Sequence, residues 1–119
     1  MEEDFVTFKL AKKLQEKGFN KECFAHYDDL GNLLLDQDYW KLDSHILAPT
    51  ISQALKWLRE EKKLHIVIVT GRDIVTNTRL WGYKIWDLAN HVWLHARIAD
   101  NSYELAALSG IEFVIDNLI

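Results

Sequence analysis

Two histidines in the second half of the chain have a spacing found in zinc sites. His91 and His95 are four residues apart, which on a helix would place both imidazoles on one face. Val92 stands where metalloproteases of this kind have a glutamate. In a strand the two rings would point the same way but lie about 13 Å apart, too far to share an ion. We therefore expect these histidines to pack or to face water, and we predict neither a metal ion nor a cofactor.

Three segments carry residue types that handle phosphate. HYDDLGNLL (26–34) and HIVIVTGRD (65–73) resemble the first two motifs of haloacid-dehalogenase phosphatases, and ADNSYELAALSG (99–110) faintly resembles their acidic metal motif. The resemblance implies that Asp28 is the nucleophile and that Thr70 holds phosphate at the end of a strand. Arg72 follows that strand and could bind an anion.

Two positions depart from the phosphatase pattern. Leu30 stands in place of the general acid and Asn32 in place of the threonine, so the proton donor that a leaving group needs is missing. The chain is also short for a parallel sheet, in which each crossover unit takes about 30 residues or more. The competing interpretation is that Asp28–Gly31 is a hairpin turn and that Arg72 also belongs to a turn.

Aromatic residues are concentrated in one part of this chain, which has five tryptophans. Trp81, Tyr83, Trp86 and Trp93 fall in two predicted strands. They could form a surface that docks a protein, because aromatic anchors dominate many interfaces, or they could fill the core. With period-two alternation Trp81 and Tyr83 share a face and Trp86 turns to the other. At least one aromatic group should therefore leave the core side.

The elements that position these residues are clearest at the middle of the chain. Thr50 and Gln53 have the spacing of a capping box, and Ile51, Leu55 and Leu58 make one face of the following helix apolar. The β-branched run Ile66–Val69 then predicts a strand.

Other elements follow from periodicity and caps. A first helix begins at Thr7 and stops at Gly18, and Ser102 caps a last helix. That last helix either continues to Leu118 or ends at Gly110, in which case Ile111–Ile115 is a strand. The remaining predicted strands are Cys23–Tyr27, Leu33–Leu35, Leu80–Trp86 and His91–Ile98, with a loop at Asp36–Ser44. The predicted fold is a single α+β domain, 1–119, with a mostly antiparallel sheet of about five strands and two or three helices.

Composition restricts the function classes. The 119 residues carry a formal net charge of −4, which gives no electrostatic case for nucleic acid as a partner. The N-terminus opens with acidic residues and no apolar run reaches the length of a membrane span, so we expect a cytoplasmic protein and no membrane partner. Cys23 is the single cysteine and sits in an apolar strand, where buried, inert thiols are common.

Three stretches resemble a family of small uncharacterised proteins of gut Bacteroidetes and their phages and prophages. They are ECFAHYDDLG (22–31), ILAPTISQALKWLRE (46–60) and SYELA (102–106). The resemblance implies an α+β fold with helices on an antiparallel sheet, and it brings no established activity or catalytic residues.

Two functions remain open from the residues. The first is a non-enzymatic accessory protein of bacterial or prophage origin, which binds a partner protein or associates with itself, using the aromatic residues as its surface. The alternative is a degenerate phosphatase-like or phosphate-binding domain that uses Asp28, Thr70 and Arg72. The second predicts a parallel sheet with a strand at Ile111–Ile115.

Overall fold

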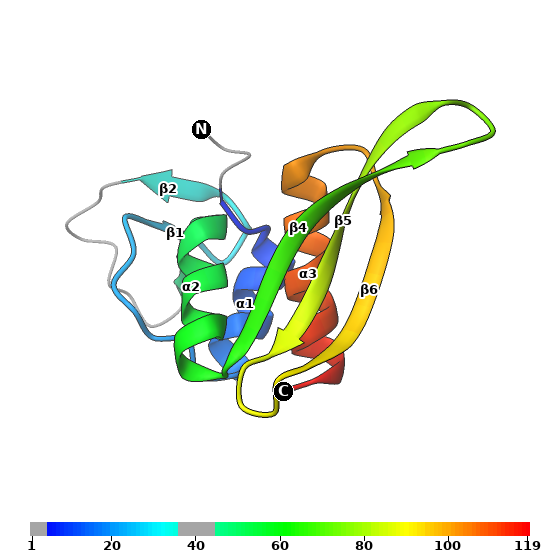
Figure 1. The fold of residues 1–119 in the computed structure, drawn as a ribbon. Helices are drawn as coiled ribbons and strands as arrows, with labels where there is room; N and C mark the ends of the chain where they lie inside the picture. The colour runs from blue at the N-terminus through cyan, green and yellow to red at the C-terminus, as the bar shows by residue number, and fades with distance from the viewer. Residues whose placement is uncertain (1–4, 36–44) are drawn as a thin grey trace. The chain divides into compact units, whose positions relative to one another are not determined.

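The computed structural model describes residues 5–35 and 45–119. The chain separates into two compact units, Met1–Ala54 and Leu55–Ile119, which are described one at a time. The predicted loop at Asp36–Ser44 lies outside the described residues. In chain order the elements are α1 (Phe8–Glu16), β1 (Ala25–Tyr27), β2 (Leu33–Leu35), β3 (Ile46–Ala48), α2 (Ile51–Glu61), β4 (Leu64–Asp73), β5 (Thr78–Asp87), β6 (Val92–Asp100) and α3 (Tyr103–Asn117) (Figure 1).

The first unit is a small antiparallel sheet accompanied by α1. Its strands are ordered β2-β1-β3, and α1 packs beside β3. The Tyr27 hydroxyl donates a hydrogen bond of 2.5 Å to the Val6 carbonyl, which ties the chain before α1 to the sheet. Leu10, Ala11 and Leu14 are the buried residues of α1, as its apolar stripe predicts.

The helix ends agree with the sequence. The Thr7 side chain accepts a hydrogen bond from the Leu10 amide. At the other end Gly18 has a φ of 100°, and the Phe19 amide donates to the Leu14 carbonyl, which is the Schellman arrangement. The capping box of α2 is also confirmed, since Thr50 and Gln53 exchange hydrogen bonds of 3.0 and 3.1 Å.

The second unit is a larger antiparallel sheet, ordered β4-β5-β6, with α3 packed on one face. The residues that face α3 are buried and apolar on the two strands nearest the helix. They are Leu64 and Ile66 of β4 and Tyr83 and Ile85 of β5. Burial of these side chains and of the α3 residues Ala107, Ile111 and Val114 forms the core of this unit.

The α+β class and the antiparallel pairing are confirmed, whereas the strand arrangement is only partly as predicted. The described residues contain six strands in two sheets, not one sheet of about five. β3 was missed, because three residues before a proline are too few to show alternation. Ile111–Ile115 is helical and every strand pair is antiparallel, so the described chain lacks the topology that the phosphatase alternative predicts. Among the same residues, no helix is long and apolar enough to cross a membrane.

Close packing against the sheet explains why α3 has a glycine, Gly110, in its middle. A Cβ at this position would lie 2.9 Å from Cγ2 of Ile66 and 3.2 Å from Cγ of Tyr83. The helix backbone therefore approaches the sheet more closely than any residue with a side chain would allow. This close approach offsets the loss of about 1 kcal/mol that glycine brings to a helix interior.

We predict that Gly110→Ala lowers the free energy of unfolding by about 1–2 kcal/mol, because overpacking costs more than helix propensity returns. Urea denaturation measures this change. Adding Ile66→Leu removes the branch methyl nearest the new Cβ, so the double variant should lose less than the two single losses combined. A Gly110→Ala protein more stable than the wild type would contradict the packing argument.

Candidate binding surface on the outer sheet face

The face of the second sheet that points away from α3 carries apolar side chains in contact with solvent. We call it the outer face. Alternation along each strand assigns its members, because successive side chains point to opposite sides. They include Val67 and Val69 of β4, Lys84 and Trp86 of β5, and Trp93, Ala96 and Ile98 of β6. None of these seven is fully buried.

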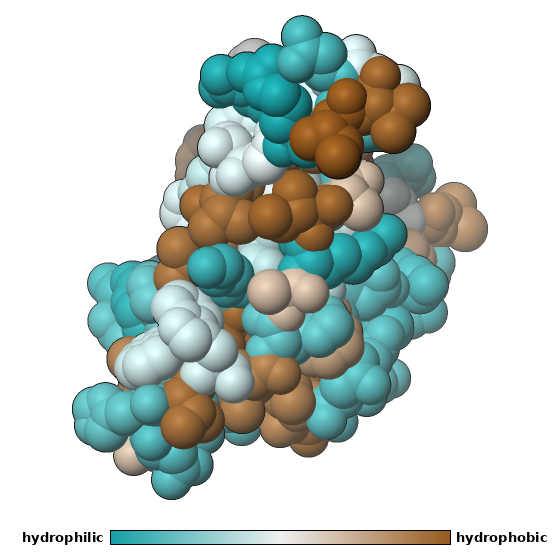
Figure 2. Space-filling view, turned by 45° about the vertical axis from the view of Figure 1, so that its right-hand side comes forward, coloured by the Kyte–Doolittle hydropathy of each residue, from teal (hydrophilic) through white to brown (hydrophobic). Residues whose placement is uncertain are grey.

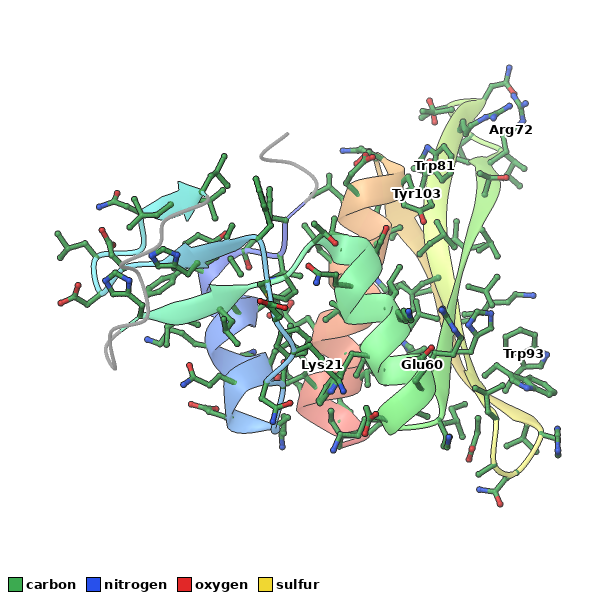
Figure 3. All side chains as sticks on the ribbon, turned by 90° about the vertical axis from the view of Figure 1, so that its left-hand side faces the viewer. Lys21, Glu60, Arg72, Trp81, Trp93 and Tyr103 are labelled. Carbon is green, nitrogen blue, oxygen red and sulfur yellow. The ribbon has the colours of Figure 1, made fainter. Side chains whose placement is uncertain are left out.

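Trp86 and Trp93 form the aromatic centre of the outer face. They pair across β5 and β6, and their rings meet edge to face with centroids 4.8 Å apart. Trp93 is 53% exposed and points away from α3 (Figure 3). The ammonium group of Lys84 lies 5.3 Å from the centroid of the Trp93 ring, within cation–π range. A positive charge therefore stands directly over an exposed aromatic ring.

A shallow groove of about 350 Å³ opens beside this pair. Its lining consists of Lys84, Trp93, Leu94, His95 and Ala96. The groove coincides with a shift of register, because Ile85 pairs with His95 while the next residue, Trp86, pairs with Trp93. Leu94 is the extra residue of this β-bulge and is 41% exposed. A bulge changes the direction in which the side chains of its strand point.

Glycines flatten the other end of the outer face. Gly82 pairs with Ile98, and a Cβ on Gly82 would lie 2.7 Å from Cγ1 of Ile98. A Cβ on Gly71 of β4 would lie 3.0 Å from Cγ2 of the same side chain. Ile98 thus lies across two strands that offer no side chains there, and it remains 41% exposed. Figure 2 shows hydrophobic side chains interspersed with hydrophilic ones on this side of the molecule.

The aromatic residues proposed from the sequence divide between the two faces. Trp86 and Trp93 belong to the outer face, so the prediction that an aromatic group leaves the core side is confirmed. Tyr83 does not belong to a surface: it is 2% exposed and its ring packs 6.4 Å from that of Phe113. Trp81 packs edge to face on Tyr103 of α3, with centroids 6.0 Å apart (Figure 3).

Sequence reasoning missed Lys84, Leu94 and Ile98. Lys84 was visible as the polar member of an alternating strand, but its place over an aromatic ring depends on pairing with β6. The face on which Trp93 lies depends on the bulge at Leu94, and no local pattern marked that bulge.

The residues of the phosphatase alternative fall in different units. Asp28 belongs to the first, where it closes the turn between β1 and β2, and Thr70 and Arg72 belong to β4 of the second. The Asp28 carboxylate accepts from the amides of Leu30 and Asn32, both at 2.9 Å. These hydrogen bonds lower the pKa of Asp28, and the one from the Asn32 amide has the largest effect. The carboxylate thus has the role expected of an Asp in a hairpin turn.

His91 and His95 do not act as a pair. His91 has a φ of 59° in the turn before β6, and His95 stacks on Phe113 of α3 with centroids 3.8 Å apart. No group of three or more His, Cys, Asp or Glu side chains in the described ranges could hold a metal ion.

The first unit contains a buried histidine that the sequence did not single out. His26 of β1 is 1% exposed and stacks on His45, with centroids 4.6 Å apart. Burial is the main cause that lowers the pKa of His26, the charge on His45 lowers it further, and Asp28 opposes the shift. His26 is therefore held neutral in the folded protein at pH values where an exposed histidine begins to take up a proton.

We predict that stability falls as the pH drops below about 6.5, the ordinary pKa of histidine. The unfolded chain then binds a proton that folded His26 does not, and the loss continues to the lowered pKa at up to about 1.4 kcal/mol per pH unit. Thermal unfolding between about pH 8 and 5 measures it. His26→Phe should flatten the dependence, whereas His91→Asn, at a position whose positive φ asparagine tolerates, should not. An equally steep loss in His26→Phe would refute the assignment.

Cys23 is buried as expected. Its Sγ lies 3.3 Å from the Lys21 carbonyl, and burial raises the pKa of the thiol from 9.0 to about 11.

We expect native Cys23 to react with a disulfide reagent about a hundredfold more slowly than in urea, since two pKa units remove that factor of reactive thiolate. Absorbance of the released thiol gives both rates. Equal rates in the two conditions would show that Cys23 is accessible.

No protein-family model, curated protein or solved structure matches this chain. The resemblance to small Bacteroidetes and phage proteins stays a prediction from the motifs.

Proposed function

We propose that this protein is a non-enzymatic binding module that docks a protein segment on the outer face of the β4-β5-β6 sheet. The observation that carries the proposal is the exposed apolar surface of β6, together with Lys84 over Trp93. The bacterial or prophage accessory role suggested by the sequence motifs is part of the same proposal.

The exposure of large apolar residues on β6 supports the proposal. An antiparallel sheet covered on one side usually alternates apolar residues inside with polar residues outside. On β6, three large apolar residues at the outer face and its bulge are instead 41–53% exposed; they are Trp93, Leu94 and Ile98. Leaving such side chains in water costs free energy that a partner would recover by covering them.

The charge on the outer face indicates the chemistry of the partner. Lys84 is exposed and borders the groove with Trp93, Leu94 and Ala96. An apolar segment that also carries a carboxylate would place its side chains in the groove and its charge beside the ammonium group. The partner segment we propose is therefore acidic and aliphatic together.

The size of the face sets the strength of binding. Three strands of nine or ten residues span about 14 Å by 30 Å, or on the order of 400 Å². A stable interface buries about 800 Å² on each partner. We therefore expect a transient complex with a dissociation constant in the micromolar range or weaker.

A displayed peptide library selected on the wild-type protein tests the proposal. We expect the enriched peptides to combine Asp or Glu with Ile, Val or Leu. Trp93→Ala and Lys84→Glu should each weaken the selected peptides about tenfold or more, since a central aromatic anchor contributes more than about 1.4 kcal/mol.

Two matched variants control for loss of apolar area and reversal of charge away from the outer face. They are Leu105→Ala on the exposed part of α3 and Lys56→Glu on α2, and both should bind the peptides as the wild type does. Peptides that bind Trp93→Ala and Lys84→Glu with wild-type affinity would place the binding site elsewhere. A selection that enriches no acidic residue would contradict the proposed chemistry of the partner.

A further inference from the structure

The tip of the β4–β5 hairpin exposes two large aliphatic residues. Ile74 is 90% and Val75 89% exposed, in a turn where glycine, asparagine, aspartate and proline are usual. Figure 1 shows the hairpin projecting beyond the ends of α3 and β6. A hydrophobic group is also visible at this end of the molecule in Figure 2. Neither turn geometry nor the core of the unit requires aliphatic side chains here.

Hydrogen bonds within the turn support the tip. Asp73 accepts from the Val75 amide at 2.9 Å through Oδ1 and from the Asn77 amide at 2.6 Å through its carbonyl. The Arg72 guanidinium donates to the Asn77 side chain at 2.9 Å. A preorganised projection loses little conformational entropy when it is bound.

The chemistry of the tip complements that of the groove. Asp73, Ile74 and Val75 are a carboxylate followed by two aliphatic side chains, the combination that Lys84, Trp93 and Leu94 would accept. A tip cannot reach the groove of its own sheet. Lys84 pairs with Val67, and the seven residues from Val67 to Ile74 put the tip about 23 Å away along the same strand.

We propose that the hairpin tip of one copy, Asp73–Val75, docks in the groove beside Trp93 of a second copy. This rests on the proposed function and names its partner segment. The contact is head to tail, so a pair of copies still has one free tip and one free groove, and association continues into rings or filaments. A two-fold contact centred on the groove would instead bring two Lys84 ammonium groups close together, which is unfavourable.

An anionic surface such as a membrane or a nucleic acid is the competing occupant of the tip, since Arg72 and Arg79 face each other at its base. Two observations favour the second copy. The Arg72 guanidinium is engaged with Asn77, and the chain carries a net charge of −4, which opposes approach to a polyanion.

Mixing two complementary variants tests the proposal by sedimentation velocity. Ile74→Ser with Val75→Asn removes the apolar tip and keeps turn-forming residues. Ala96→Glu places a carboxylate in the groove, where it repels Asp73 and blocks docking. We expect the wild type to grow beyond a dimer as its concentration rises and each variant alone to remain monomeric. An equimolar mixture should form dimers and nothing larger, because it contains one working tip and one working groove per pair.

Asp73→Asn provides a milder test, because asparagine keeps the acceptor that closes the turn and loses the charge. It should weaken association severalfold, and added salt should weaken the wild type in the same direction. Circular dichroism of each variant checks that it is folded. If Ala96→Glu is not folded, Lys84→Glu takes its place as the groove variant.

The proposal would be overturned by a wild type that stays monomeric up to about millimolar concentration, by variants that associate alone, or by a mixture that stays monomeric. Tip-dependent binding to anionic vesicles by a monomeric wild type would also overturn it. Peptide selection on the outer face is independent of these outcomes. If it succeeds while self-association fails, the proposed function stands and the partner is another protein.

Discussion

The packing of α3 against one face of the β4-β5-β6 sheet is the constraint on which the second unit depends. Gly110 brings the helix backbone close to Ile66 and Tyr83, and this contact fixes which residues of each strand are covered. Because side chains alternate across a sheet, covering one set determines the set that faces water. The burial of Tyr83 on β5 and the exposure of Trp93 on β6 both follow from which face of the sheet α3 covers.

The outer face differs from a plain solvated sheet in composition and in shape. Its shape comes from irregularities on β6, where the bulge at Leu94 opens a groove beside Trp93 and the pairing with Gly82 lets Ile98 lie across the neighbouring strands. Bulges also blunt an edge strand against uncontrolled pairing. The same features thus discourage strand addition along β6 and create a local concavity for a small projection.

Two polar residues of the first unit lie in structural contacts. Asp28, the most suggestive carboxylate in the sequence, closes a turn by accepting hydrogen bonds from the chain that follows it. His26 lies buried against His45, where its neutral form is favoured. Side chains that catalytic motifs share with turns and cores cannot be assigned a role until the groups that surround them are known.

The sequence alone determined the local structure: the caps at Thr7, Thr50 and Ser102, the left-handed ending at Gly18, and the alternation that separates Trp86 from Tyr83. These features depend on residues a few positions apart, whose propensities act before the chain folds. Tertiary structure decided what depends on distant pairs: the six described strands in two sheets, the helical state of Ile111–Ile115, the face of Trp93 and the position of Lys84 above it. Strand register and helix docking join residues far apart in the chain, so no local pattern records which of them meet.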